Sequence, residues 1–326
     1  MDSPAWRCPL RNYIIQRLAL TVPTILGLTV LVFFLLHVVI KTDAVDIMLA
    51  EYGSADPELA QQLREEFGLG GSMVTQYLRW LGNILTGDLG TSLFTKRSVA
   101  SELATRMPTS IEIGVGALML STIIAIPIGI ISAVKQDSLP DYVLRGSAIL
   151  LDAIPGFWAA TLVLVFGSVW FGWAPPLEYR SLWEDPVANL KIMITPMILL
   201  GLQPVGRMVR LVRTQVLEIV RQDYVRTATA KGLGWRPLYT RHVLRNALLP
   251  VVTVIGLQLP RLIAGTVIFE TVFGLPGVGR YLLDAVGRLD YPVILATNLV
   301  FGLTLILANL IVDVSYGWID PRIRFS

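Results

Sequence analysis

Long apolar stretches restrict what this sequence can fold into more than any other feature. A hydrocarbon core of about 30 Å is crossed by roughly 20 consecutive apolar residues in an α-helix. Six stretches reach this length, at residues 14–40, 109–134, 143–170, 192–212, 248–269 and 293–316. Charged residues make up only 16% of the chain, against roughly 25% in a soluble domain. The sequence therefore predicts an all-α integral membrane protein with about six transmembrane helices.

The first stretch is predicted to be a retained helix. It is too long for the apolar region of a cleaved signal peptide and lacks a small-residue cleavage site at its end. The polar residues 41–107 then form an insertion, and residues 108–316 form a core of five helices. Short segments at 1–13 and 317–326 complete the predicted organisation.

The distribution of Lys and Arg predicts the orientation, because these residues accumulate in cytoplasmic loops. They concentrate in the N-terminal segment, after the second and fourth stretches, and in the C-terminal tail. The short loops on the other side hold only Arg180, Lys191, Arg280 and Arg288. We expect both termini and the loop after the fourth stretch to be cytoplasmic, and the 41–107 insertion to be external. The net charge of +3 follows this pattern, so it does not indicate a nucleic-acid partner.

Two short amphipathic helices are predicted in the external insertion. The first covers residues 57–67, where Pro57 suits the first turn, Asp56 can cap it and Gly68, Gly70 and Gly71 end it. The second covers residues 73–85, with an apolar stripe of Val74, Tyr77, Leu78 and Leu81. We expect both helices to lie over the outer face of the membrane.

Catalytic and metal-binding patterns are absent from the sequence. A P-loop needs a Gly-Lys pair, and the chain contains none. It also lacks HExxH, CxxC and GxSxG, and Cys8, His37 and His242 are its only Cys and His residues. We therefore expect no enzyme activity, no metal site and no cofactor bound by this chain. The energy for any transport would come from a gradient or from another polypeptide.

The predicted cytoplasmic loop, residues 214–250, is too long for a simple connection. Apolar residues at helical spacing predict one helix from residue 217 to 231, which carries a small-residue surface at 227–230. Gly232 and Gly234 end this helix, and a second one, at about 236–247, returns to the membrane at Pro250. Two interpretations remain open on physical grounds alone: a basic hairpin lying on anionic lipid, or a hairpin that docks another protein.

The same loop resembles that of permease subunits of binding-protein-dependent ABC importers, in the dipeptide and oligopeptide group. The stretch reads DYVRTATAKGL, followed by RHVLRNALLPVV. Thr227-Ala228-Thr229 stands where the family signature has Glu-Ala-Ala, Gly232 takes the place of its Gly, and Leu248-Leu249-Pro250 forms its end. The missing Glu departs from the general signature in the way that is usual for the peptide group.

The resemblance extends over the rest of the chain. The segments that carry it are Gln76–Trp80 with Gly87–Ser92, Arg106–Ser110, Phe269–Gly279 and Asp320–Arg324. After the first stretch the family commonly shows Pro-Gly-Asp-Pro, whereas this chain has residues 41–46 with the sequence KTDAVD.

The resemblance implies a type I ABC importer permease fold in a prokaryotic inner membrane. It implies pairing with a homologous second permease, as a heterodimer or a homodimer, and docking to a cytoplasmic ATPase that uses ATP and Mg. An external binding protein would supply the solute, with dipeptides, oligopeptides, nickel chelates, glutathione and oligosaccharides all open. The residues implied in docking are Tyr224, Arg226, Thr227, Ala228, Ala230, Lys231, Gly232 and Pro250.

Polar residues inside the apolar stretches are candidates for lining a transport pathway, because charge in a bilayer usually faces protein or water. The candidates are Asp152, Gln258, Arg261, Asn298 and Asn309. The alternative is that they join helices through hydrogen bonds. Two other functions are alternatives: a secondary transporter driven by an ion gradient, which would show inverted repeats that the sequence lacks, and a structural membrane subunit.

Overall fold

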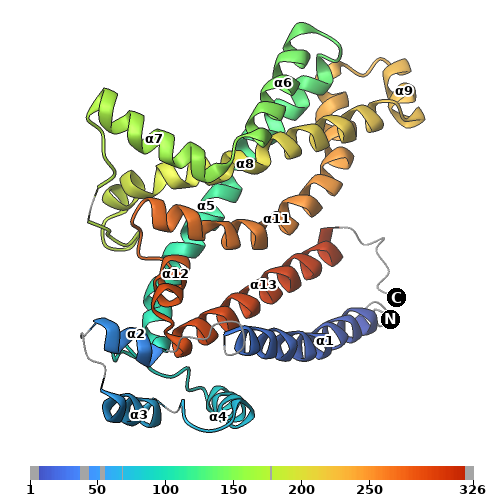
Figure 1. Ribbon diagram of the computed structural model, residues 1–326. Helices are drawn as coiled ribbons and strands as arrows, with labels where there is room; N and C mark the ends of the chain where they lie inside the picture. The colour runs from blue at the N-terminus through green and yellow to red at the C-terminus, as the bar shows by residue number, and fades with distance from the viewer. Residues whose placement is uncertain (1–6, 37–43, 52–55, 68, 177, 320–326) are drawn as a thin grey trace. The chain divides into compact units, whose positions relative to one another are not determined.

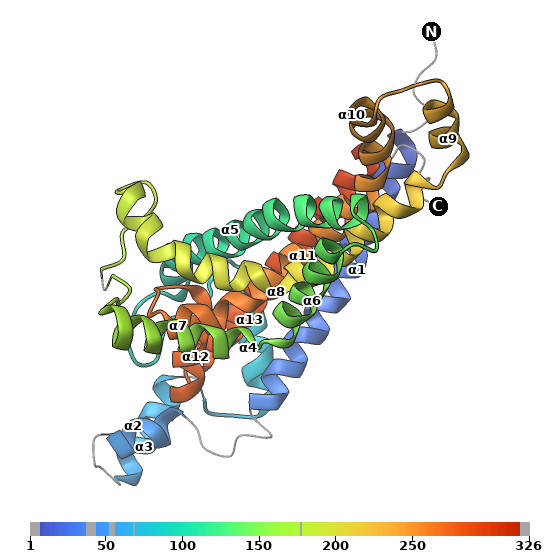
Figure 2. The same ribbon diagram turned by 90° about the horizontal axis from the view of Figure 1, so that it is seen from above.

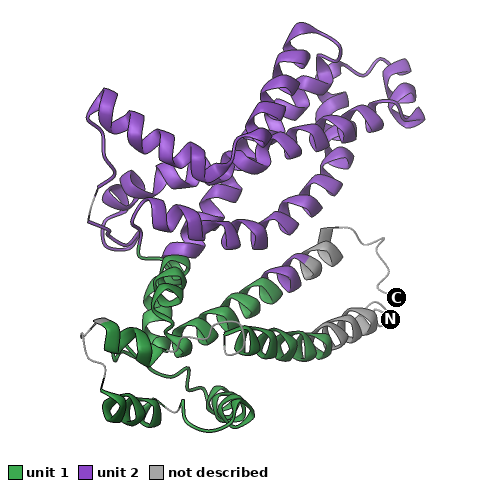
Figure 3. Cartoon of the chain, viewed as in Figure 1, with its two compact units in different colours: residues 1–108, 276–307, 325–326 green, residues 109–275, 308–324 purple. Residues whose placement is uncertain are grey.

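The computed structural model describes residues 7–36, 44–51, 56–67, 69–176 and 178–319, and these are mostly helical (Figure 1). Contacts divide the chain into two compact units (Figure 3). Unit 1 comprises residues 1–108, 276–307 and 325–326, and unit 2 comprises residues 109–275 and 308–324. Helices α5 (Val99–Val134) and α13 (Tyr291–Ile319) contribute to both units. Outside the described residues lie the predicted end of the first stretch with residues 37–43, the glycine at position 68 and the tail motif at 320–324.

Four of the described helical runs are long and apolar enough to cross a membrane. They are α5, α8 (Pro186–Val220), the described part of α13 (Tyr291–Val312), and the run Trp235–Val272, which joins α10 (Trp235–Pro237), the π-helical η2 (Leu238–Val243) and α11 (Leu244–Val272). Helix α1 (Arg7–Phe34) contributes the shorter apolar stretch Ala19–Phe34. All six apolar stretches of the sequence thus contain helices. Four of the described helical runs qualify as spans, and a bent pair of helices gives a fifth if it is counted as one span.

The third apolar stretch, residues 143–170, is the bent pair, which counts as one span only if the break is included in it. Helix α6 (Leu139–Ala153) and helix α7 (Gly156–Phe171) meet at a bend of 92°. Ile154 is extended at the break, with φ −85° and ψ 118°, because a residue before proline avoids the helical region and Pro155 has no N–H for a helical hydrogen bond. By contrast, Pro196 and Pro260 lie inside continuous helices.

Unit 1 contains α1, the short helices of the insertion, α12 (Val278–Arg288) and parts of α5 and α13. The insertion forms α2 (Ala44–Glu51), α3 (Pro57–Glu66) and α4 (Met73–Leu85). The predicted bounds of the last two helices are confirmed within one residue, and Asp56 caps α3 by accepting a hydrogen bond from the Glu58 amide at 2.9 Å. The core around these helices includes the buried Val99, Tyr281 and Ile294.

The inward face of α4 agrees only in part with the predicted stripe of Val74, Tyr77, Leu78 and Leu81. Val74 and Leu78 are 67% and 59% exposed, whereas Tyr77 packs edge-on against Phe33 with 5.3 Å between ring centroids. The Tyr77 and Thr29 hydroxyls are also hydrogen-bonded at 3.0 Å. Of the predicted stripe, Tyr77 therefore faces the core of unit 1, whereas Val74 and Leu78 face outward.

Unit 2 is built on close contacts between α8 and its neighbours α6, α11 and α5. One face of α8 is buried through the residues Val205, Met208, Val209, Val212 and Val216. Glycines bring the helix backbones together: a Cβ on Gly201 would lie 2.7 Å from the Ala117 carbonyl oxygen, and one on Gly206 would lie 2.1 Å from that of Ala148. Small residues at such positions are typical of packed membrane helices.

Candidate functional site

The loop after the fourth apolar stretch forms a hairpin at the ends of α8 and α11 (Figures 1 and 2). Helix α8 ends at Val220, and α9 (Asp223–Ala230) begins after a break at Arg221 and Gln222. The predicted single helix over residues 217–231 is therefore wrong, because Gln222 is extended, with ψ 146°, and separates two helices. Gly232 then turns the chain with φ +81°, a conformation that favours glycine.

The inner face of α9 is fastened to the returning arm of the hairpin. Val225 is buried against the cluster that contains Val243 and Ala247. The Asn246 side-chain amide donates to the Tyr224 hydroxyl at 2.9 Å, and this hydroxyl lies 3.4 Å from the His242 carbonyl oxygen, to which it donates. Apolar burial and polar contacts thus hold α9 against η2 and the start of α11.

The structure divides the predicted docking residues into two groups. Those exposed are Arg226, Thr227, Ala230, Lys231 and Gly232 on α9 and its turn, with Pro250 on α11. The other two face inward at least in part: Ala228 packs against the hairpin core, and Tyr224, although 43% exposed, is engaged through its hydroxyl.

Two apolar side chains beside the turn were missed by the reasoning from sequence. Trp235 is 66% exposed and Leu233 is 37% exposed. Both lie next to the glycines of the turn. Large apolar residues at an expected turn are unusual, and this feature of the sequence could have identified them. Because exposed aromatic residues are enriched in the centres of protein interfaces, they extend the candidate docking face beyond α9.

A buried ion pair joins α6 to α8. Both oxygens of Asp141, which is fully buried, accept from Arg213, at 2.9 Å from Nε and 2.8 Å from Nη2. The Ser132 hydroxyl and the Asp137 amide also donate to this carboxylate, at 2.5 and 3.0 Å. The contacts fasten the turn between α5 and α6 to α8, and neither partner of the pair was among the predicted site residues.

A second ionic contact lies further along the same two helices. Asp152 near the end of α6 is 2.7 Å from Arg210 Nη2 and 3.4 Å from Arg207 Nε. Asp152 was a predicted pathway residue, and the arginines were not. The sequence prediction counted the two arginines among the basic residues that follow the fourth stretch, and therefore not as pathway residues.

The other predicted pathway residues have separate surroundings. Gln258 is buried, and Arg261 and Asn309 are exposed. The Asn298 amide donates within its own helix, to the Ile294 carbonyl oxygen at 2.8 Å. No described hydrogen bond or ion pair connects the predicted pathway residues with one another.

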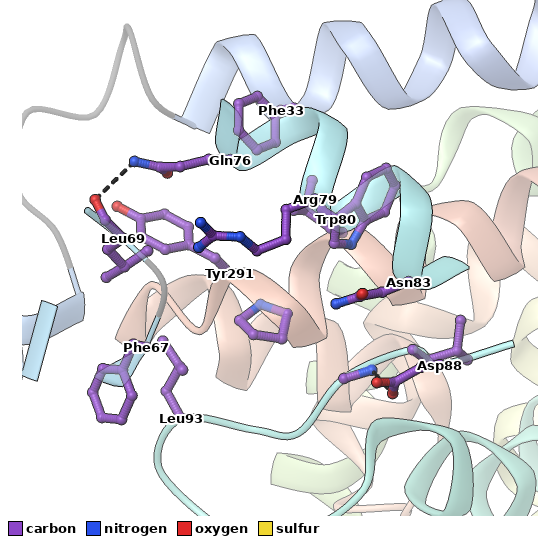
Figure 4. A pocket seen from close by; sticks show the side chains of 14 residues that line it. Phe33, Phe67, Leu69, Gln76, Arg79, Trp80, Asn83, Asp88, Leu93 and Tyr291 are labelled. Carbon is purple, nitrogen blue, oxygen red and sulfur yellow. Dashed lines mark hydrogen bonds between the residues drawn. The ribbon is translucent and has the colours of Figure 1, made fainter. Parts of the chain in front are cut away.

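Unit 1 contains a cavity of about 150 Å³ beside α4 (Figure 4). Phe33, Trp80 and Tyr291 contribute aromatic walls, and Arg79 and Asn83 extend from α4 into the same region (Figure 4). The Gln76 amide donates to the Leu69 carbonyl oxygen at 2.7 Å, which fixes the link between α3 and α4.

The segment after α4 is anchored to the residue that precedes α13. Asp290 accepts from the Ser92 hydroxyl at 2.5 Å and from the Leu93 amide at 3.2 Å. Burial raises the pKa of the Asp290 carboxyl above its usual range, although these two hydrogen bonds act in the opposite direction. Gly90, with φ +82°, and a bridge between Thr91 and Ser98 shape this turn. The motif at residues 87–92 is therefore a docked turn in unit 1.

The comparison with protein families decides the identity of the chain. Residues 125–325 match the family of binding-protein-dependent transport system inner membrane components. This chain belongs to that family. The matched range includes the hairpin and both ionic contacts between α6 and α8. The family is that of the membrane component, so the predictions of a multi-pass inner-membrane protein and of a subunit that is not an enzyme are confirmed.

Relatives with curated names span nearly the whole chain. The dipeptide transport system permease protein of Escherichia coli (strain K12) is 39% identical, over 96% of this chain and 98% of its own length. The oligopeptide transport system permease protein of Bacillus subtilis (strain 168) is 35% identical, over 96% of this chain and 99% of its own length. The predicted resemblance to the dipeptide and oligopeptide permease group is thus confirmed.

A solved structure of the methionine ABC transporter MetNI in inward-facing conformations is similar in fold. It aligns with a TM-score of 0.53 and 17% identity, over 67% of this chain and 96% of the matched chain. An amino acid ABC transporter structure aligns with a TM-score of 0.51 and 11% identity, over 67% of this chain and 94% of the matched chain. The all-helical permease architecture is therefore shared with ABC importers.

Proposed function

We propose that this chain is one permease subunit of an ATP-driven importer for peptides or similar small solutes. It forms the translocation pathway together with a homologous second permease. A separate ATPase uses ATP and Mg, and an external binding protein delivers the solute. This permease itself binds no cofactor, and both of its termini face the cytoplasm. The names of the full-length relatives support peptides as the substrate class.

The observation that carries the proposal is that α9 has one exposed face, while its other face is packed against η2 and the start of α11. Thr227, Ala230 and Gly232 offer a surface of small residues that another protein can approach closely. The neighbouring ion pair of Arg226 with Asp223, at 3.7 Å, is highly exposed, and such pairs contribute roughly 1 kcal/mol or less. The fit of small residues, and not charge, is therefore expected to dominate docking.

The contacts of α9 with its neighbours would transmit a movement caused by the ATPase to the membrane helices. Val225 and the Tyr224–Asn246 hydrogen bond tie α9 to η2 and α11, and a short break ties it to α8. Closely packed elements move together because their interiors have few voids. A displacement of α9 by the ATPase would thus be passed to α8 and α11.

Co-purification with the candidate ATPase tests this function. We would compare the wild type with Thr227→Trp, which places a large side chain on the exposed face of α9. Thr240→Trp is a matched control, because Thr240 is also exposed on the hairpin and its hydroxyl likewise donates to the carbonyl four residues earlier. We expect Thr227→Trp to reduce the recovered ATPase at least tenfold and Thr240→Trp to leave it nearly unchanged.

Each of the contrary results has a separate meaning. Equal recovery of the ATPase with both variants would show that the face of α9 is not the docking surface. Failure of the wild type to bind any ATPase, with normal membrane insertion, would remove the importer proposal and favour a gradient-driven transporter.

A further inference from the structure

Helix α8 carries a polar stripe along the face opposite its buried residues. The stripe consists of Gln203, Arg207, Arg210, Thr214 and Glu218, and Arg221 follows it at the break after the helix. Its members are three or four residues apart, so they lie on one side of the helix. It runs from the middle of a candidate membrane span to the break before α9. A continuous polar stripe on a membrane helix is expected to face water or protein and not lipid.

Two arginines of this stripe, Arg207 and Arg210, form a triad with Asp152 of the neighbouring helix α6. Each oxygen of Asp152 engages a different arginine: Oδ2 lies 2.7 Å from Arg210 Nη2, and Oδ1 lies 3.4 Å from Arg207 Nε. Two guanidinium groups therefore share one carboxylate. The triad keeps one positive charge without a balancing negative charge among its own members.

The arginines of the triad remain accessible. The side chain of Arg207 is 55% exposed, and that of Arg210 is 42% exposed. Arg207 is 13 residues before the end of α8 at Val220, which is about 20 Å along a helix. An accessible surplus charge on a candidate membrane span is expected to contact water or an anion and not lipid.

We propose that the triad binds the carboxylate of the transported solute, such as the C-terminal carboxylate of a peptide, on its way along the polar face of α8. This inference rests on the proposed function and names a substrate contact within it. Arg207 makes the main contact, since its guanidinium presents several N–H donors in a fork that matches a carboxylate. Asp152 is a positioning residue: it holds Arg210 closely and leaves Arg207 more loosely attached.

The phosphate of an anionic lipid headgroup offers similar anionic oxygens, so the test must separate the two sources. The complete transporter, with both permeases, the ATPase and the binding protein, is reconstituted in two kinds of vesicle. One contains phosphatidylcholine alone, and the other contains phosphatidylcholine with phosphatidylglycerol. The probe is radiolabelled L-alanyl-L-alanine, and the readouts are initial uptake and the ATPase rate stimulated by the binding protein.

Arg207→Gln is the informative variant, because it leaves the 2.7 Å contact between Asp152 and Arg210 intact. We expect it to lower dipeptide uptake about tenfold in both kinds of vesicle, with an unchanged ATPase rate and normal recovery of the complex. Arg207→Lys should retain most of the uptake. Arg180→Gln is the control, because Arg180 is not part of the triad and forms an exposed ion pair with Glu178, with 2.9 Å between the charged groups. This variant should behave as the wild type.

Unchanged uptake with Arg207→Gln would overturn this inference and leave the proposed function standing. A loss of uptake confined to vesicles with phosphatidylglycerol would also overturn it, because the triad would then bind a lipid headgroup. If the wild type takes up no dipeptide in either kind of vesicle, although its ATPase is stimulated by the binding protein, this inference fails for dipeptides while the importer function stands; absence of both uptake and stimulated ATPase activity would contradict the proposed function itself.

Discussion

Substitution of Gly206 by alanine tests the packing on which unit 2 depends. An added Cβ would lie 2.1 Å from the carbonyl oxygen of Ala148 and 3.0 Å from its carbon. An ordinary contact between carbon and oxygen is roughly 3.3 Å, so α6 and α8 would have to separate locally by about 1.2 Å. The obstacle is backbone, which cannot rotate away as a flexible side chain can.

The expected cost follows from this geometry. Overpacking a close contact destabilises by about 1–3 kcal/mol, and the gain in helix propensity from Gly to Ala offsets only about 0.8–1.0 kcal/mol of it. The same separation would lengthen the contacts of Asp152 with Arg210 and of Asp141 with Arg213, which join these two helices. Because the obstacle is backbone, we place the cost of Gly206→Ala in the upper part of that range; the net cost of about 1–2 kcal/mol should lower the unfolding temperature by roughly 2–8 °C.

Thermal unfolding of the detergent-purified protein, followed by tryptophan fluorescence, measures this effect. Gly146→Ala is the matched control on α6, because a Cβ there meets nothing within 4 Å. The control should gain stability from helix propensity, by roughly 2–4 °C. An unfolding temperature for Gly206→Ala equal to or above that of the wild type would refute the close approach of α6 and α8.

Three further predictions concern other parts of the chain. Arg213→Leu leaves the buried carboxylate of Asp141 without its main partner, so it should cost about 3–5 kcal/mol in unfolding free energy. Replacement of both Asp141 and Arg213 by leucine should cost less than the single substitution. A double variant that is less stable than Arg213→Leu in denaturant unfolding would contradict this. Gly232→Ala forces a side chain to adopt φ +81° and should weaken the hairpin by about 1–2 kcal/mol, lowering ATPase recovery. Gly234→Ala, at φ −62°, should not, so equal recovery would argue against a strained turn. Burial raises the pKa of Asp290, so its contribution to stability is fully present below the unfolded value of about 3.9 and is lost as the pH rises through the folded pKa. Unfolding measured from about pH 4 to pH 7 should show this decline in the wild type and less of it in Asp290→Asn, and identical profiles would exclude the carboxylate as its source.

Local signals located the helices well where they agree with the packing. Asp56 and Pro57 begin α3 as expected of a cap and a first-turn proline. Gly232 turns the chain after α9 because glycine adopts positive φ without steric cost. These features depend on neighbours within a few residues, and the sequence displays such neighbours directly.

Local signals failed where neighbours distant in sequence decide the outcome. The apolar period of α4 marked Val74, Tyr77, Leu78 and Leu81, but of these Tyr77 packs against Phe33 in the core, whereas Val74 and Leu78 are exposed. The helix at residues 217–231 looked continuous, yet it breaks at Gln222, and α9 packs against the returning arm of the hairpin. Periodicity shows that a face is apolar, but it does not show which partner covers that face.

The sequence by itself determined that this is a helical membrane protein, because apolar stretches of sufficient length can satisfy their backbone groups in lipid only as helices or closed barrels, and stretches of this length favour helices. It also determined the family, through motifs spread along the chain. Only the tertiary structure decided which charges meet. Asp152 and Arg210 are 58 residues apart in sequence and 2.7 Å apart in space, because α6 packs against α8 where Gly206 lets the backbones approach. Such pairing depends on interhelical geometry, which no local pattern of residues encodes.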